Sequence, residues 1–236
     1  NKAYMARATQ VFERGNWLAK GDTVQPGTPP VLNAWDSNWP KNRYGLSQWI
    51  VSKENPLTAR TLVNRVWDQI FGRGIVATIE DMGTQSDPPT HPELLDWLAL
   101  SFMNEDQWSI KALIKDIVMS GTYRQNSENS PELYQRDPQN ELYARGPRLR
   151  LTAEQIRDQA LAVSGLLSPK MYGPGVMPPQ PEGIWQSVYS NEKWTESEGE
   201  DKNRRAVYTY LKRTSPYPSF ITFDAGSREV CTIRRT

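Results

Sequence analysis

Residues 55–72 read NPLTARTLVNRVWDQIFG, and this stretch decides the fold class. Its apolar side chains recur three and four positions apart, which places them on one face of an α-helix. Asn55 and Pro56 are residues typical of a helix start, and Gly72 is typical of a helix end. The stretch therefore predicts an amphipathic helix with an inward apolar face. The inward residues are predicted to be Leu62, Val63, Val66, Trp67, Ile70 and Phe71.

The same helical spacing recurs on both sides of this stretch. It predicts a short helix over 45–54 and longer helices within 93–103, 108–123 and 151–167. The tryptophans of these helices, Trp49, Trp67 and Trp97, are predicted to lie in the core. The other residues predicted to face inward are Leu94, Leu95, Leu98 and Phe102, then Ile110, Leu113, Ile114, Ile117 and Val118, and finally Ala153, Ile156, Ala160, Val163 and Leu167.

The remaining sequence is rich in Pro and Gly and predicts loops with short strands. We divide the chain into an extended N-terminal arm or strands (1–44), a helical core (45–168) and a loop-rich C-terminal part (169–236) packed on that core. A short strand is predicted at 75–79, whereas residues 204–213 fit a strand or a helix. The fold class is mainly α: about five helices with short peripheral strands and long Pro/Gly-rich loops, forming one domain overall.

Composition narrows the classes of function. The 236 residues carry a net charge of +1, which gives no general attraction for nucleic acid, and no apolar run is long enough to span a membrane. Cys231 is the single cysteine, so the chain has no C-x-x-C-H motif for covalent haem and no multi-cysteine metal site. We therefore expect no cofactor and no metal in this chain.

His91 is the single histidine and lies in the sequence Thr90-His91-Pro92-Glu93. A Thr followed three residues later by Glu is the pattern of a capping box, in which both side chains bond free backbone N–H groups at a helix start. We favour this structural interpretation of the stretch. The alternative is a chemical role for His91 beside Asp81, with Glu80 and Asp87 as further carboxylates on the same loop.

The charged residues downstream admit two interpretations. Asp137 precedes a proline and is predicted to begin a turn. The arginines bind carboxylate, sulfate or phosphate groups from a ligand, or pair internally with Asp158, Asp201 or Asp224. Because the net charge is near zero, we favour internal ion pairs. The arginines are Arg145, Arg148, Arg150, Arg204, Arg205 and Arg213.

The loop residues Trp185 and Trp194 either stack on a sugar or fill gaps in the packing.

Several stretches, in order and over nearly the whole chain, resemble one family. They include NPLTARTLVNRVWDQIFGRGIV (55–76), EDMGTQSDPPTHPELLDWLA (80–99), DPQNELYARGPRLRLTAEQIRDQALAVSGLL (137–167) and RRAVYTYLKRTSPYPSFITFDAGSREVCTIRRT (204–236). They are similar to the planctomycete-type C-terminal domain known as domain of unknown function 1553. The resemblance supplies no established catalytic residue.

The resemblance implies a setting. Such domains end long exported proteins that begin with a cytochrome c-like haem segment, in bacteria that break down polysaccharides. It thus implies a periplasmic or otherwise extracytoplasmic location and c-type haem elsewhere in the parent protein. The start at Asn1 and the abrupt end at Thr236 agree with our expectation that the chain is a fragment of a longer polypeptide.

These observations lead to two expectations for function. The first is a non-haem C-terminal module of a cytochrome c-associated protein, serving assembly, ligand binding or electron-transfer partnering. Its partners are the other domains of the same polypeptide, including the haem domain, and a carbohydrate ligand. The second is an enzyme that acts on polysaccharide, or on its oxidised or sulfated products, through an Arg-lined cleft. The candidate ligand-binding residues are His91, Asp81, Arg204, Arg205, Arg213 and Asp224.

Overall fold

The helix that begins after Asn55 shows how local chemistry shapes the chain. In the computed structural model this helix, α2, spans Thr58–Phe71. The Asn55 side chain accepts hydrogen bonds from the backbone N–H groups of Leu57 (3.0 Å) and Thr58 (3.2 Å), which lack carbonyl partners in the first turn. Gly72 ends the helix in the left-handed conformation, with φ of 78°. The end predicted at Gly72 is confirmed, and Asn55 bonds the first N–H groups as predicted, but the helix begins at Thr58 rather than at Pro56.

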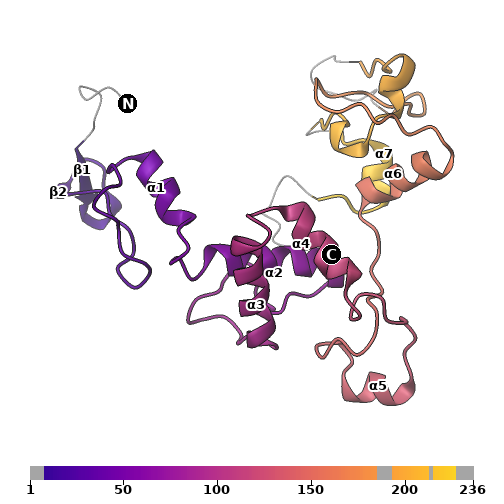
Figure 1. Ribbon diagram of the computed structural model, residues 1–236. Coiled ribbons are helices and arrows are strands. Elements are labelled where there is room, and N and C mark those ends of the chain that lie inside the picture. Colours follow the sequence, from indigo (N-terminus) through magenta and orange to yellow (C-terminus); the bar gives the residue numbers. More distant parts are fainter. Residues whose placement is uncertain (1–7, 185–192, 213–214, 227–236) are drawn as a thin grey trace. The chain divides into compact units, whose positions relative to one another are not determined.

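The structure describes residues 8–184, 193–212 and 215–226 (Figure 1). The chain divides into two compact units, residues 1–147 and residues 148–236. This division groups residues 148–168 with the C-terminal residues. The predicted packing of the C-terminal part on the helical core stays a prediction.

The first unit begins with a two-stranded antiparallel hairpin. Strand β1 (Thr9–Phe12) pairs with strand β2 (Lys20–Val24), and the short 3₁₀ helix η2 (Glu13–Gly15) follows β1. Helix α1 (Arg43–Ile50) comes after a long loop and starts at Asn42. The side chain of Asn42 accepts hydrogen bonds from the first backbone N–H groups of the helix.

Three helices build the core of the first unit. Helix α2 packs against α3 (Pro92–Asn104), and both contact α4 (Ile110–Met119) (Figure 1). Their inward side chains, with residues from two adjoining loops, form one cluster from which water is excluded. The buried members are Ala59, Val63, Trp67, Phe71, Ile75, Val76, Leu95, Leu98, Ala99, Phe102, Met103, Leu113, Ile117 and Tyr143.

The predicted inward face of α4 is only partly right. Leu113 and Ile117 are buried, but Ile110 is exposed and Ile114 has 40% of its surface exposed. Helix α4 carries apolar side chains on more of its circumference than α2 and α3 cover. The sequence pattern shows which residues share a face, whereas the neighbours decide how wide a face is buried.

The strand predicted at 75–79 is wrong. Ile75 and Val76 are buried, yet their backbone groups bond to Asn64 and Thr90 rather than to a second strand. The side chain of Asn64 accepts a hydrogen bond from Val76 N and donates one to Val76 O, both at 2.9 Å. The Ile75 carbonyl accepts hydrogen bonds from Thr90. These bonds satisfy buried backbone groups without a ladder.

The last part of the first unit is a long loop interrupted by the short helix α5 (Pro131–Arg136). Asp137 lies directly after it and begins the predicted turn, since its carbonyl accepts a hydrogen bond from Asn140 N. Its carboxylate accepts hydrogen bonds from the backbone N–H groups of Glu141 (2.8 Å) and Leu142 (2.9 Å). The turn predicted at Asp137 is therefore confirmed.

The second unit begins with α6 (Ala153–Val163). The predicted capping box at its start is confirmed, because Thr152 and Gln155 each bond the other's backbone N–H. The predicted inward stripe is only partly right: Ala153 is buried and Ile156 and Leu167 are half-buried, but Ala160 and Val163 are exposed. The second unit covers the first turn of this helix and leaves much of the rest uncovered.

The rest of the second unit is loop with short helical turns. They are η3 (Gly199–Asn203), η4 (Ala206–Tyr208) and α7 (Pro218–Thr222). The stretch that fitted a strand or a helix contains one 3₁₀ turn, η4, between two isolated strand-like bridges, Ser168 to Arg204 and Val176 to Thr209. Within the part of this unit that the structure describes, the apolar cluster has three buried members, which are Ala153, Ala206 and Phe220.

The described residues form seven α-helices and one small hairpin, so the mainly α fold class is confirmed. Across these residues, none of the helices is both long and apolar enough to cross a membrane.

Candidate functional site

His91 occupies the residue position directly before α3, and the capping box predicted around it is absent. Neither His91 nor Thr90 caps the helix with its side chain. The Thr90 hydroxyl and backbone N–H instead donate to the carbonyl of Ile75, at 3.2 and 2.9 Å. The prediction is wrong because the buried Ile75 carbonyl takes the hydroxyl that the helix start would otherwise use.

The imidazole of His91 contacts Thr90. His91 Nδ1 lies 3.0 Å from Thr90 Oγ1, and the same hydroxyl donates to the Ile75 carbonyl. His91 is therefore linked through Thr90 to the loop at residue 75.

Tyr143 lies beside this ring and is 7% exposed. Its ring centroid lies 5.3 Å from those of His91 and Phe71 and 5.2 Å from that of Trp67. Burial raises the pKa of Tyr143, while Trp67, Thr90 and the charge of Arg73 lower it to a smaller extent. Trp67 and Thr90 approach the Tyr143 hydroxyl, but it forms no hydrogen bond of normal geometry within the described residues. The hydroxyl therefore stays neutral and poorly satisfied.

Asp81 closes its own turn. Its carboxylate accepts a hydrogen bond from Gly83 N at 2.7 Å, and its backbone bonds Thr78 in both directions. Among the described hydrogen bonds, none joins Asp81 to His91. These two candidates are therefore not paired as an acid and a base.

The candidate arginines of the second unit hold loops together. Arg205 pairs with Asp158 at 3.0 Å, and Arg150 pairs with Asp224 at 2.8 Å. The favoured interpretation as internal ion pairs is confirmed for these two pairs. Asp201 pairs with a lysine, Lys170, at 2.8 Å.

Arg204 is 1% exposed and contacts no carboxylate among the described residues. Its guanidinium donates to the carbonyls of Tyr172 and Pro174 and lies 3.8 Å from the centroid of the Tyr208 ring. This arrangement clamps the turn at residues 172–175 by hydrogen bonds and a cation–π contact. It leaves the cation no free face for a ligand.

Three residues singled out in the sequence, Arg213, Trp185 and Cys231, lie outside the described residues. Trp194 stacks on Tyr217 with 5.8 Å between ring centroids and donates from its indole to the Pro178 carbonyl. Its contacts fit the packing interpretation.

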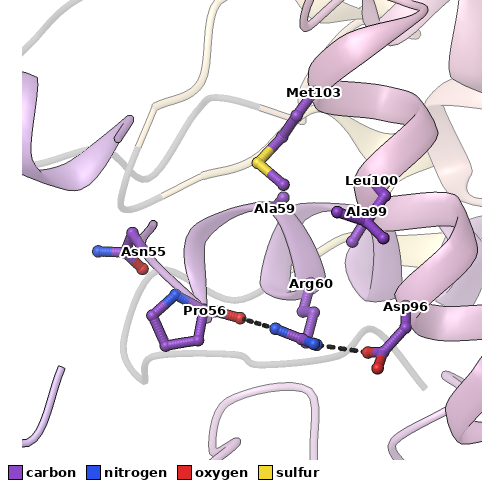
Figure 2. Close-up of a pocket in the computed structure, with 8 residues that line it drawn as sticks. All are labelled: Asn55, Pro56, Ala59, Arg60, Asp96, Ala99, Leu100 and Met103. Carbon is purple, nitrogen blue, oxygen red and sulfur yellow. Dashed lines mark hydrogen bonds and ion pairs between the residues drawn. The ribbon is translucent and has the colours of Figure 1, made fainter. Parts of the chain in front are cut away.

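A small cavity between the start of α2 and α3 was not foreseen from the sequence (Figure 2). Its volume is about 30 Å³. Figure 2 shows the Arg60 side chain between the Pro56 carbonyl and the Asp96 carboxylate, which it meets at 2.6 Å. The lining residues are Asn55, Pro56, Ala59, Arg60, Asp96, Ala99, Leu100 and Met103.

Trp97 was predicted to lie in the core and is 58% exposed. The reason is that α3 already buries Leu95, Leu98 and Phe102 on its inner face. Its neighbour at helical spacing, Leu100, is also exposed and lines the cavity. The exposed aromatic ring and the cavity therefore occupy adjoining positions on one helix, a juxtaposition that the spacing alone did not signal.

The described side chains include no group of three or more His, Cys, Asp or Glu residues placed to hold a metal ion.

Comparison with curated proteins and with solved structures gives no significant match. A family model described as PSD1, protein of unknown function (DUF1553), matches residues 42–236, so the chain belongs to this family.

Proposed function

We propose that the chain is a non-haem C-terminal module of an extracytoplasmic, cytochrome c-associated bacterial protein of the planctomycete type. Its role is to assemble with the other domains of that polypeptide, including the haem domain, and to support ligand binding or electron-transfer partnering. The setting rests on the family resemblance described above. The structural support comes from one feature, the uncovered apolar side of α4.

Helix α4 buries only part of its apolar face. Leu113 and Ile117 contact the core of the first unit, while Ile110 and Ile114, which lie on the same face at helical spacing, are exposed. The apolar face of an amphipathic helix normally packs against a neighbouring element. Exposed apolar residues that gather on one element also mark interaction surfaces. We therefore assign the uncovered side of α4 to contact with another domain of the parent protein.

The contacts of the charged candidates favour a module over the enzyme alternative. Arg205 and Asp224 are each in an ion pair, and Arg204 is enclosed by carbonyls and an aromatic ring. An Arg-lined cleft for oxidised or sulfated saccharides needs arginines with unoccupied faces. An arginine that is already bonded within the protein stabilises the loops that it joins and is not available to bind a ligand.

The test compares the natural parent protein with the 236-residue chain. The absorption spectrum of the parent should contain c-type haem bands. Amide hydrogen exchange of residues 110–119 should be slower in the parent than in the chain alone, because a neighbouring domain shields α4. A parent without haem refutes the cytochrome c association. Equal exchange in the two proteins refutes the assembly role of α4.

A matched pair of variants in the parent sharpens this test. Ile114→Ser should restore fast exchange over 110–119, because it removes an apolar contact from the proposed interface. Lys115→Ser changes an exposed polar residue next to it and should leave exchange as in the parent. Equal effects of the two variants would show that helix stability, and not the interface, controls the exchange.

A further inference from the structure

The cavity beside α3 has apolar walls and a charged rim. Ala59, Ala99 and Met103 line its interior, and Arg60 and Asp96 lie at its edge (Figure 2). A water needs about 10–15 Å³ of such space, so the 30 Å³ here admits a group of about two heavy atoms. A hydroxymethyl group has this size, whereas a ring does not fit.

The rim presents a donor and an acceptor side by side. Arg60 Nε donates to Asp96 Oδ1 at 2.6 Å, and Arg60 Nη1 donates to the Pro56 carbonyl. Arg60 Nη2 and Asp96 Oδ2 form no hydrogen bond among the described residues. Hydroxyl groups both donate and accept, so neighbouring hydroxyls suit this pair. The two charges cancel, and the rim therefore has no preference for an anion.

Two exposed apolar side chains, Trp97 and Leu100, lie near the rim on α3. Leu100 lies three residues after Trp97 and four after Asp96, the spacings at which helix residues are neighbours. Trp97 and Leu100 are both exposed. The face of an indole ring packs well against the C–H face of a pyranose, which is apolar although its edge carries hydroxyls.

We propose that Trp97, Arg60, Asp96 and the adjoining cavity form a binding subsite for one residue of a neutral saccharide. Trp97 stacks on the ring, the Arg60–Asp96 pair bonds two hydroxyls, and the cavity receives a hydroxymethyl group. A peptide partner is less suited, because the exposed apolar surface here is one indole and one leucine beside a polar rim. This subsite is independent of α4 and of the assembly role proposed above.

The experiment is calorimetric titration of the 236-residue chain with neutral hexasaccharides, namely cellohexaose, xylohexaose and mannohexaose. A sulfated galactan oligosaccharide serves as the anionic comparison. At least one neutral probe should bind, and Trp97→Ala should weaken that binding about tenfold or more. Trp97→Phe keeps an aromatic face and should lose less. Trp17→Ala removes another exposed tryptophan, in the loop before β2, and should leave the affinity unchanged.

The rim is tested separately. Asp96→Ala should weaken binding severalfold, and Asp96→Asn should lose less because the amide keeps an acceptor oxygen. Exposed ion pairs contribute about 1 kcal/mol or less to stability, so both variants should melt close to the parent chain. Unchanged melting with weakened binding supports a role in the site.

Four results overturn the proposal. The first is that no neutral probe binds. The second is that Trp17→Ala weakens binding as much as Trp97→Ala. The third is tighter binding of the sulfated probe through Trp97, which would assign an anionic ligand. The fourth is protection of Trp97 by another domain in the parent protein, which would make this face a protein interface.

Discussion

The two units of the chain are held together by different chemistry. In the first unit, three helices bury a cluster of fourteen residues, nearly all of them apolar. Among the described residues of the second unit, the corresponding cluster has three buried members. There the structure depends on Arg204, on the Arg205–Asp158 pair and on hydrogen bonds from loop to loop. The contrast shows that membership of one family domain does not imply one mode of stabilisation.

The difference has a physical consequence for substitutions. Apolar burial is non-directional, so its loss scales with the volume removed and with how well the site collapses. A polar clamp is directional, so its loss leaves specific carbonyls unsatisfied. Substitutions should therefore affect the first unit through cavities and the second unit through unpaired groups.

The largest effect is expected in the apolar core. Phe102 is fully buried, and Phe102→Ala should lower the free energy of unfolding of the first unit by about 3–5 kcal/mol. Urea denaturation followed by tryptophan fluorescence measures this loss. A loss below about 1 kcal/mol would show that the helices are not held by this cluster.

The next effect tests the polar clamp. Arg204→Leu should destabilise the second unit by about 2–3 kcal/mol, because the carbonyls of Tyr172 and Pro174 lose their donor. Hydrogen exchange over residues 168–178 should accelerate accordingly. Arg205→Leu is the control: its ion pair is half exposed and should contribute about 1 kcal/mol or less. Equal losses in the two variants would contradict the clamp.

A smaller effect of opposite sign is expected at Tyr143. Its buried hydroxyl forms no normal hydrogen bond, so Tyr143→Phe should stabilise the first unit by about 1 kcal/mol at neutral pH. A loss of stability would instead show that Trp67 or Thr90 bonds this hydroxyl.

The same substitution has a pH dependence. Burial raises the pKa of Tyr143 above its ordinary value, so the folded state keeps the phenol proton while the unfolded state releases it as pH rises through that value. The free energy of unfolding therefore decreases as the pH rises above the ordinary tyrosine pKa. Tyr143→Phe removes the contribution of this phenol to that decrease. Its advantage should therefore grow between pH 9 and about pH 11, measured by urea melts. A constant difference would contradict the burial effect.

The smallest effect is expected on the uncovered side of α4. Ile114→Ala should lower stability by about 0.5 kcal/mol in the 236-residue chain, since lost contact is partly offset by the higher helix propensity of alanine. Ile117→Ala, on the buried side, should lose about 2–5 kcal/mol. Similar losses for both would mean that Ile114 is buried as fully as Ile117.

Sequence reasoning located the long helices because their signals are local. Asn55, Gly72 and the Thr152–Gln155 box act within a few residues of their partners, and each was predicted correctly. Thr90 was mispredicted because its hydroxyl bonds Ile75, fifteen residues away. A competing partner at that distance leaves no mark on the local pattern.

The faces of the helices were harder to predict than the helices. Trp97, Ile114 and Val163 fit apolar stripes but are exposed, since spacing does not reveal how much surface the neighbours cover. The Arg60–Asp96 pair and its cavity were missed for a similar reason, because they require two helices to be placed first. The carboxylates Asp158 and Asp224 were named from the sequence as partners of the arginines, but which arginine each one pairs with was not.

The clamp at Arg204 also bears on how the chain is made. Arg204 bonds the carbonyl of Tyr172, thirty-two residues earlier, so this contact cannot form until the chain has been synthesised as far as residue 204. At about 5–20 residues per second, the turn at 172–175 emerges some 2–6 s before its arginine does. The helices of the first unit have all their core segments by then. Translation from the N-terminus thus completes the core segments of the first unit before the clamp of the second unit can close.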